Sequence, residues 1–290
     1  MKTWMRHSGG FLLAALTTLA SCAAWAEVQI PDENKINGFA IGCQAYTFNR
    51  FTVFEAIEKT AAAGGRVIEF YPGQKLSKEE PNVSWDHNAS DEVIAKVQAK
   101  LAQHKLKAVN YGVVGIPNNE PEARKVFDFA RKLGLRGVTT ESTESIDLIE
   151  KLVKEYDITV GYHNHPRRPN DPNYKVWDPY YILSLVKDRD RRIGSCADTG
   201  HWCTSGLNPA FCMRVLAGRI MSSHMKDKNT YGEGHDVPYG QGVSGIKDML
   251  DELKKMNFQG NISIEYEYHW ETSLPEVTEC IDFVKNYSGK

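Results

Sequence analysis

The sequence predicts an α/β protein in which eight parallel strands close into a (β/α)8 barrel, and three observations favour this fold. Short β-rich runs alternate with amphipathic helical patterns. The alternation repeats through eight strand–helix units, and a helix between successive strands implies a parallel sheet. Ionisable residues gather at the ends of the β-rich runs, where such a barrel places its reactive groups. A doubly wound open sheet is the alternative, but neither FAIGCQAY nor ITVGYHNHP carries the phosphate-binding glycine pattern it would need.

The expected elements follow one another in a regular order. The strands are short runs rich in β-branched and aromatic residues, at 39–46, 66–71, 106–112, 137–141, 158–163, 193–198, 220–226 and 262–267. The helices have apolar residues at a spacing of three and four, at 53–65, 91–105, 121–134, 144–156, 178–188, 208–218, 245–257 and 275–287. Gly64, Gly65 and Gly134 stand where a helix ends ahead of the next strand.

The amino-terminal segment has the pattern of a secretory signal. A basic start precedes the apolar run FLLAALTTLA, which is too short for a permanent transmembrane helix, and Ala24-Trp25-Ala26 is a typical cleavage site. We therefore expect residues 1–26 to be a signal peptide and residues 27–290 to form one barrel domain. Leu19-Ala20-Ser21-Cys22 offers an alternative, because it resembles the lipobox at which bacterial lipoproteins are lipidated. Either reading predicts an exported protein, periplasmic or anchored to the membrane through Cys22.

Charge and cysteine content restrict the classes of function. The net charge of −2 and the absence of a basic run argue against nucleic acid as a partner, whereas a small polar molecule such as a carbohydrate is compatible. Five cysteines remain if Cys22 leaves with the signal, and none forms a C-x-x-C pair that would indicate a zinc knuckle. Buried thiols, with one disulfide at most, are the expectation.

Ionisable and polar residues occur at the end of nearly every expected strand. Burying so many of them is costly unless they pair or bind a metal, so together they indicate a site. They are Glu69, Tyr111, Glu141, His163, His165, Asp198, His224, Lys226, Glu265 and Glu267. Carboxylate and imidazole ligands without thiolates suit Mn, Mg, Co or Zn. Glu141, Asp198, His224 and Glu265, from four different strands, are the expected ligands. Thr199-Gly200 should then turn the chain so that His201 reaches back over the pocket.

Four motifs make the sequence resemble a known family. They are DTGH at 198–201, HMKD at 224–227, PYGQG at 238–242 and SIEYE at 263–267. In this order and on these strands they resemble the xylose-isomerase-like barrels, a family that includes sugar isomerases and epimerases, inosose dehydratases and endonuclease IV. The resemblance covers nearly all of residues 27–290. It implies a TIM barrel that binds a divalent metal and a sugar, and it implies a homodimer as an expectation.

The chain departs from the family pattern at the fifth strand. Ketose epimerases of the family carry a metal-binding glutamate there, but this strand ends GYHNH without a carboxylate. Glu141 is the expected substitute and His163 the alternative. The departure puts in doubt a direct transfer of the epimerases' two-glutamate mechanism.

The general chemistry is unaffected by this departure. A divalent ion bound to a carbonyl and the neighbouring hydroxyl stabilises an enediolate, after a base has removed the α-proton. Glu265 and His163 are the candidate bases. Lys226 is expected to stabilise negative charge, and His201 to bind or protonate a substrate oxygen. The remaining candidate substrate contacts are Glu69 and Tyr111 on the pocket floor, His165 and Glu267 at strand ends, and His235 and Trp270 on loops.

The enediolate has three possible fates, which are epimerisation, isomerisation and loss of a β-substituent. An exported enzyme without a phosphate-binding loop should meet free or glycosidic sugars, and a 3-keto-glycoside would expel its aglycone on enolisation. The sequence therefore predicts a metal-dependent isomerase or epimerase, or a lyase of keto-glycosides. Two alternatives stay open: a non-catalytic sugar-binding barrel in the periplasm and a phosphodiesterase like endonuclease IV, although the latter would need more metal ligands and a basic groove.

Overall fold

The computed structural model describes Met1 and residues 29–289. The expected signal segment 1–26 and the alternative lipidation site at Cys22 therefore lie outside the described residues, apart from Met1. No helix in the described part of the chain is long and apolar enough to cross a membrane. The five cysteines between Cys43 and Cys280 are buried and free of disulfides, in line with the expectation of buried thiols.

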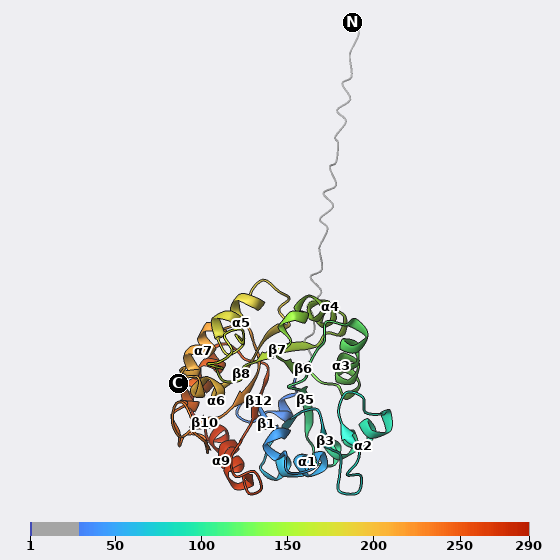
Figure 1. Cartoon of the computed structure of the whole chain (residues 1–290), viewed down its shortest axis with the longest axis vertical. Coiled ribbons are helices and arrows are strands. Elements are labelled where there is room, and N and C mark those ends of the chain that lie inside the picture. The colour runs from blue at the N-terminus through green and yellow to red at the C-terminus, as the bar shows by residue number, and fades with distance from the viewer. Residues whose placement is uncertain (2–28, 290) are drawn as a thin grey trace.

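Eight parallel strands close into a barrel, which confirms the predicted fold class (Figure 1). Around the barrel they follow their order in the chain, so each strand pairs with the strand of the next unit and the last pairs with the first. The strands are β1 (Ala40–Gln44), β2 (Val67–Phe70), β5 (Lys107–Tyr111), β6 (Gly137–Thr140), β7 (Thr159–His163), β8 (Ile193–Asp198), β9 (Ile220–Met225) and β12 (Asn261–Ile264). All eight correspond to runs that the sequence predicts.

Helices surround the barrel and cover its outer face (Figure 1). They are α1 (Val53–Ala62), α2 (Asp91–Gln103), α3 (Glu120–Leu133), α4 (Ile146–Tyr156), α5 (Pro179–Val186), α6 (Thr199–Thr204), α7 (Pro209–Val215), α8 (Ile246–Lys255) and α9 (Leu274–Lys285). Their ends follow from local chemistry. Thr52 and Glu55 form a capping box at the start of α1, and Gly134 ends α3 in the left-handed conformation at φ 68°.

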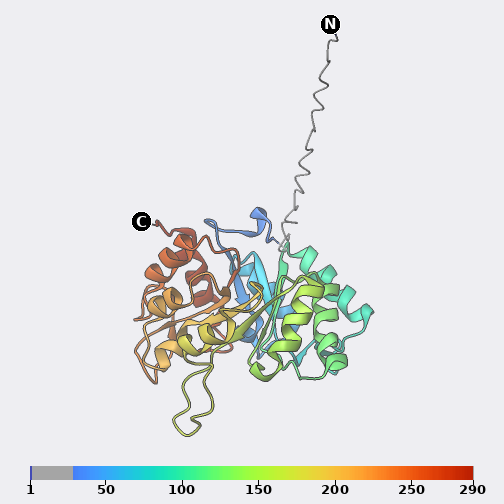
Figure 2. The same ribbon diagram turned by 90° about the horizontal axis from the view of Figure 1, so that it is seen from above.

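Several short elements depart from the simple alternation. Two antiparallel ribbons, β3 (Gln74–Lys75) with β4 (Ser84–Trp85) and β10 (Asp227–Lys228) with β11 (Asp236–Val237), lie in loops, as do the 3-10 helices η1 (Asp32–Asn34), η2 (Ala45–Phe48) and η3 (Thr143–Ser145). The loop at 164–178, between β7 and α5, projects from the body of the barrel (Figure 2). Apart from η1, which precedes β1, these segments follow the carboxyl ends of strands and shape the face on which a barrel of this kind carries its site.

The glycine of β1 shows how closely the strands approach. A Cβ atom at Gly42 would lie 1.7 Å from the backbone oxygen of Val67 on β2, so a larger residue would push the first two strands apart. Outside the barrel, Phe70 and Trp85 pack edge to face at 5.4 Å between ring centroids, and Trp85 packs on Phe129 of α3 at 5.0 Å. Such aromatic packing joins the strands to the helical layer and fixes where the strand ends lie.

Candidate functional site

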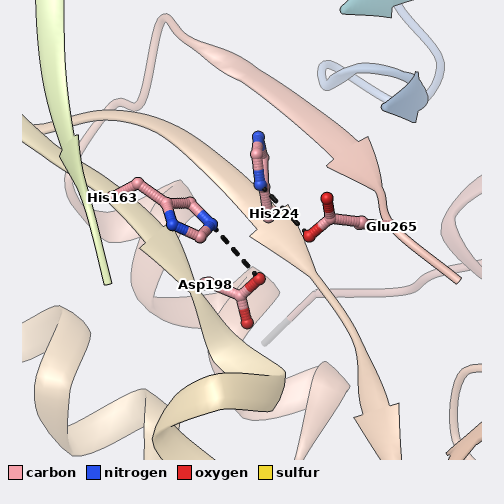
Figure 3. Close-up of side chains that lie close together, drawn as sticks. All are labelled: His163, Asp198, His224 and Glu265. Atoms are coloured by element: carbon pink, nitrogen blue, oxygen red, sulfur yellow. Dashed lines mark ion pairs between the residues drawn. The ribbon is translucent and has the colours of Figure 1, made fainter. Parts of the chain in front are cut away.

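Four ionisable side chains from neighbouring strands meet at the carboxyl end of the barrel. His163 ends β7, Asp198 ends β8, His224 lies on β9, and Glu265 follows directly after β12. One ligand atom from each lies within 4.8 Å of the others, and all four residues are buried. Figure 3 shows the two imidazoles and the two carboxylates turned toward one another. We call these four residues the inner cluster.

The inner cluster has the composition and spacing of a divalent-metal site. Nε2 of His163 lies 3.5 Å from Oδ2 of Asp198, and Nδ1 of His224 lies 3.3 Å from Oε2 of Glu265. Two ligands of one tetrahedral ion stand about 3.4 Å apart when each bond is about 2.1 Å. Both ring nitrogens of His163 and Nδ1 of His224 are buried without a hydrogen-bond partner among the described residues. Buried polar atoms normally have partners, so these nitrogens fit a bound cation.

Asp198 is held by the helix that follows it. As the N-cap of α6, its Oδ1 accepts a hydrogen bond from the backbone N–H of His201 at 2.7 Å, which leaves Oδ2 for the inner cluster. A Cβ atom at Gly200 would lie 2.6 Å from Cδ of Lys226, so this glycine leaves room for the lysine. The turn brings His201 back over the cluster, with Nε2 3.7 Å from Oδ2 of Asp198. Asp198, Gly200 and His201 of DTGH thus each have a local structural reason, and the turn returns His201 to the cluster as the sequence predicts.

Lys226 inserts its ammonium among the carboxylates of the site. Its Nζ lies 2.7 Å from Oδ2 of Asp198, 2.5 Å from Oε2 of Glu265 and 3.0 Å from Oε2 of Glu267. Burial disfavours the charged amine, but these carboxylates outweigh it and raise the pKa of Lys226 well above its usual value. Burial likewise opposes ionisation of Asp198, yet the surrounding cationic groups hold its pKa well below its usual range. The ammonium therefore bonds the same two oxygen atoms that face the histidines of the inner cluster.

The two histidines of the inner cluster favour their charged forms when no cation neutralises the carboxylates. Burial works against protonation of His163, but contacts with Asp198 and Glu141 raise its pKa to about 9. Burial also opposes the charge on His224, yet Cys196, Glu69 and Glu265 raise its pKa well above the usual value. A metal binds neutral imidazole, so it would displace protons from both rings.

Glu141, an expected metal ligand, has other partners in the structure. Its Oε1 lies 2.6 Å from Nδ1 of His165 and accepts a hydrogen bond of 2.7 Å from the hydroxyl of Tyr174, but it is 3.9 Å from Nδ1 of His163. The fourth corner of the inner cluster is instead His163, the alternative considered from the sequence. Glu141 forms a second group with His163 and His165, next to the inner cluster.

Glu69 and Tyr111, expected on the pocket floor as substrate contacts, are both enclosed by protein. Glu69 is fully buried beneath His224, with Oε1 3.0 Å from Nε2 of the imidazole. Tyr111 is fully buried against Phe129, at 4.8 Å between ring centroids, and its hydroxyl contacts Nδ1 of His87 at 3.2 Å. The strand-end position of Glu69 does not predict how deeply its side chain is buried. The strand-end position of Tyr111 does not predict that its ring packs outward against the helices. Neither residue is positioned to touch a substrate.

A cavity of about 290 Å³ opens beside the inner cluster. Its lining includes two residues of the inner cluster, three further expected site residues and six residues that the sequence does not predict for the site, two of them tyrosines. The lining residues are His163, Glu265, His165, His201, Glu267, Gln44, Tyr46, Tyr71, Pro72, Gly112 and Val113. Tyr46 and Tyr71 lie just after β1 and β2, so their strand-end positions were the available signal.

The cavity also contains groups suited to proton transfer. Burial raises the pKa of Glu267 despite the nearby ammonium of Lys226. Burial lowers the pKa of His201 well below its usual value, so its imidazole is neutral at pH 7. His165 lines the cavity with a side chain that is 41% exposed. These three residues are accessible from the cavity, unlike the enclosed Asp198 and His224.

The two expected loop residues lie near the rim. The ring of Trp270 packs edge-on against Tyr46, at 5.8 Å between centroids. His235 is exposed and stacks on Tyr268 at 4.4 Å, outside the residues that line the cavity. Trp270 thus borders the cavity through Tyr46, whereas His235 belongs to the outer surface of the same loops.

The PYGQG motif has a structural explanation. The backbone N–H groups of Gly240 and Gly242 donate to Oδ2 of Asp227 at 2.9 and 3.0 Å, and that of Ser244 donates to Oδ1 at 3.0 Å. A Cβ atom at Gly242 would lie 2.4 Å from Oδ1 of Asp227. The motif therefore wraps the loop around the aspartate next to Lys226 and fixes the end of β9.

Comparisons with known proteins give consistent results for the fold. The family model described as "Xylose isomerase-like TIM barrel" matches residues 57–287. A solved structure of a putative uncharacterized protein from Parabacteroides distasonis is 30% identical, with a TM-score of 0.70, and the match covers 87% of this chain and all of that one. No curated protein sequence matches the chain.

Two more distant structures share the fold. A D-tagatose 3-epimerase-like protein is 18% identical, with a TM-score of 0.65 and coverage of 85% of this chain and 96% of the other. A probable 3-DHS dehydratase from Bacillus anthracis is 13% identical, with a TM-score of 0.61 and coverage of 85% and 98%. At these identities the likeness is one of architecture.

Proposed function

The chain belongs to the xylose isomerase-like TIM barrel family, and from that premise we propose that it is a divalent-metal-dependent enzyme that enolises a carbonyl sugar. The observation that carries the proposal is the inner cluster, in which four buried ligand atoms from His163, Asp198, His224 and Glu265 lie within 4.8 Å of one another beside a polar cavity. The metal is Mn, Mg, Co or Zn, because the donor set combines imidazole with carboxylate and lacks thiolate.

The residues around the cavity have two kinds of role, metal binding and proton transfer. A bound ion would polarise the carbonyl and adjacent hydroxyl of the sugar, which eases removal of the α-proton. Because Glu265 and His163 point into the inner cluster, we assign them to the metal and give proton transfer to Glu267 and His201, which line the cavity. The raised pKa of Glu267 brings this carboxyl closer to the pH at which a general base is most effective.

Two cationic or polar groups assist these residues. Lys226, 3.0 Å from Glu267, stabilises negative charge that develops on the substrate. His165 is oriented by its 2.6 Å contact with Glu141 and is placed to bind a substrate hydroxyl. Trp270 contributes through the aromatic rim. These roles keep the predicted chemistry. Glu267, His201 and His165 act from the cavity lining, whereas Lys226 is buried and acts through its contact with Glu267.

The fate of the enolised sugar distinguishes the enzyme subtypes. Reprotonation gives an epimerase or isomerase. In a 3-keto-glycoside, removal of the C2 proton and cleavage of the C1–O bond form a C1=C2 double bond, and the departing oxygen takes up a proton, so no oxidant or reductant is required. One neighbour in fold is named as epimerase-like and another as a probable dehydratase, and both reaction types are compatible with this proposal. Export to the periplasm and a homodimer stay predictions.

Proton NMR in D₂O tests the proposal. The protein is loaded with Mg²⁺ and offered ketohexoses and a 3-keto-disaccharide, with a chelator as control. We expect metal-dependent loss of an α-proton signal, with bond cleavage only if the enzyme is a lyase. Substitution H224A should abolish exchange, and H269A, at a histidine paired with Glu276 on the surface, should not. Zn²⁺ is tested in the same way, and Mn²⁺ and Co²⁺, which broaden proton lines, are tested in a quenched assay. Absence of exchange with all four metals would contradict the proposal and favour the sugar-binding barrel.

A further inference from the structure

The cavity beside the inner cluster has two faces of different chemistry. One face carries the ionisable side chains His163, His165, His201, Glu265 and Glu267. The rest of the lining includes Tyr46 and Tyr71, with Pro72, Gly112 and Val113. We call Tyr46, Tyr71 and the adjoining Trp270 the aromatic wall. A sugar that reacts at the polar face does not by itself account for a function of this wall.

The wall offers a ligand the rings of Tyr46, Tyr71 and Trp270, whereas the one amide beside them is already engaged. Gln44, the one amide that lines the cavity, donates from Nε2 to the backbone oxygen of Gly112 at 2.8 Å and accepts at Oε1 from the backbone N–H of Tyr46 at 3.2 Å. Because Gln44 is 1% exposed and engaged at both ends, it fixes the wall in place. A partner for this surface should present a flat apolar face.

The wall also continues beyond the cavity. Tyr46 is 39% exposed and packs edge-on against Tyr71, at 5.1 Å and 81°, and against Trp270, at 5.8 Å and 88°. The three residues come from the loops after β1, β2 and β12, which are neighbouring strands in the barrel. Trp270 lies outside the cavity lining, so the aromatic surface leads from the inner cluster to the rim. A substrate that follows it is longer than one sugar ring.

We propose that the aromatic wall is a subsite for the ring attached to the reacting sugar, so that the substrate is a glycoside with a pyranose or an aryl leaving group. This inference rests on the proposed function, because it places the reacting sugar at the inner cluster. The polar face binds the keto sugar through its oxygens, and the wall stacks on the flat face of the second ring. A free monosaccharide would leave Tyr46 and Trp270 without a role.

Binding of unoxidised probes tests the subsite without requiring turnover. Titration calorimetry on the full-length protein compares methyl β-glucoside, cellobiose and phenyl β-glucoside. We expect cellobiose, phenyl β-glucoside or both to bind about tenfold more tightly than the methyl glycoside, and the better of the two identifies the leaving group. In Y46A this advantage should fall to about threefold or less. Y46F should retain it, because the ring and not the hydroxyl makes the contact.

A matched control excludes a general effect of losing a tyrosine. Tyr180 lies on α5, is 58% exposed and is outside the cavity lining, so Y180A should keep the wild-type preference. Equal losses for all three glycosides in Y46A would overturn the inference, since the wall would then stack on the reacting ring itself. Wild-type affinities that do not differ among the probes would also overturn it.

The subsite and the proposed function fail in different experiments. Metal-dependent α-proton exchange on a free keto sugar reports on the inner cluster and needs no second ring. If exchange occurs but Y46A does not alter the probe preference, the subsite is wrong and the function stands. If exchange is absent while the preference depends on Tyr46, the wall is a binding surface and the enolisation chemistry is wrong.

Discussion

The carboxylate of Glu69 lies directly beneath His224, with Oε1 3.0 Å from Nε2 of the imidazole, and neither side chain is exposed to solvent. Glu69 also accepts hydrogen bonds from Thr139 at 2.9 Å and from Ser263 at 2.7 Å. Burial would raise the pKa of Glu69, but His224 and these hydroxyls outweigh it and keep the carboxyl ionised. A buried carboxylate with this many donors holds the ring in one orientation.

In the neutral ring that would bind a metal, the contact also selects the tautomer of His224. Because Nε2 faces a carboxylate, it carries a proton, and Nδ1 is left to face Glu265 at 3.3 Å. A metal-binding histidine commonly donates its other N–H to a carboxylate in this way, which raises the basicity of the ligand nitrogen. We therefore expect Glu69 to position His224, in place of the substrate contact that its strand-end position suggests.

Substitution E69Q tests this role. The amide keeps the size of the side chain but removes the charge, so we expect Mn²⁺ affinity to fall by about 10- to 100-fold while the fold is retained. Calorimetric titration measures the affinity, and circular dichroism checks the fold. The control is E276Q, which changes another glutamate that contacts a histidine, His269, at 2.8 Å on the surface. If both variants bind Mn²⁺ as the wild type does, Glu69 does not support the metal.

The fourth metal ligand can be identified by a pair of variants. H163A removes a buried corner of the inner cluster, so we expect Mn²⁺ affinity to fall by about 100-fold or more. E141Q should retain affinity within about fivefold, because Glu141 is engaged by His165 and Tyr174. Electron paramagnetic resonance of added Mn²⁺ measures free and bound ion in both variants. A larger loss of Mn²⁺ affinity in E141Q than in H163A would mean that Glu141 is the fourth metal ligand.

The fold could be predicted from the sequence because the signals are local and repeated. Each barrel strand and its helix carry their own hydrophobic period, and eight repeats leave few alternatives to a closed barrel. The helix α6 and the two ribbons were not predicted. They are short, and their formation depends on contacts such as the cap from Asp198 and the loop around Asp227. Such contacts lie within single turns and loops and leave no hydrophobic period in the sequence.

The site could be predicted at the level of strand ends but not of side-chain partners. Asp198, His224 and Glu265 meet as expected, because parallel strands bring their carboxyl ends to one face. The choice between Glu141 and His163 depends on side-chain rotamers and on Tyr174, which arrives from a distant part of the loop at 164–178. The outward packing of Tyr111 likewise depends on which face of the strand it occupies.

Lys226 and a metal ion should compete for the same oxygen atoms. Substitution K226M removes the ammonium that bonds Asp198 and Glu265, leaving the carboxylates without a counterion. We expect the metal-free protein to lose about 3–5 kcal/mol of stability, and its Mn²⁺ affinity to rise by about tenfold. Denaturant unfolding with and without Mn²⁺ measures both effects. Turnover should nevertheless fall, because the lysine also neutralises charge near the substrate.

A neighbouring ion pair supplies the control for this experiment. Lys228 lies 3.0 Å from Asp236 and is also largely buried, so K228M should destabilise the protein without changing Mn²⁺ affinity. Weaker Mn²⁺ binding in K226M than in the wild type would contradict competition. It would indicate that the lysine helps to shape the metal site.

The stability of the metal-free protein should fall as pH rises from about 6.5 to 9. The pKa of His163 is raised to about 9 in the folded protein, whereas that of an unfolded histidine is about 6.5. A raised pKa contributes stability that is complete below pH about 6.5 and is lost as pH approaches 9, at about 1.4 kcal/mol per pH unit for each such histidine. His224, whose pKa is also raised, acts in the same direction. His201 has a lowered pKa, so its contribution increases stability as pH rises toward about 6.5. That contribution is complete before this pH window begins.

Metal affinity should change in the opposite direction over the same window. Binding displaces protons from His163 and His224, so the logarithm of the affinity should rise by about one to two per pH unit between pH 6.5 and 8.5. Thermal unfolding with a chelator and with excess Mn²⁺ under nitrogen measures both trends in one set of samples. The gap between the two melting temperatures should widen with pH. A constant gap would mean that the histidines are already neutral when the site is empty, and that the cation displaces Lys226 alone.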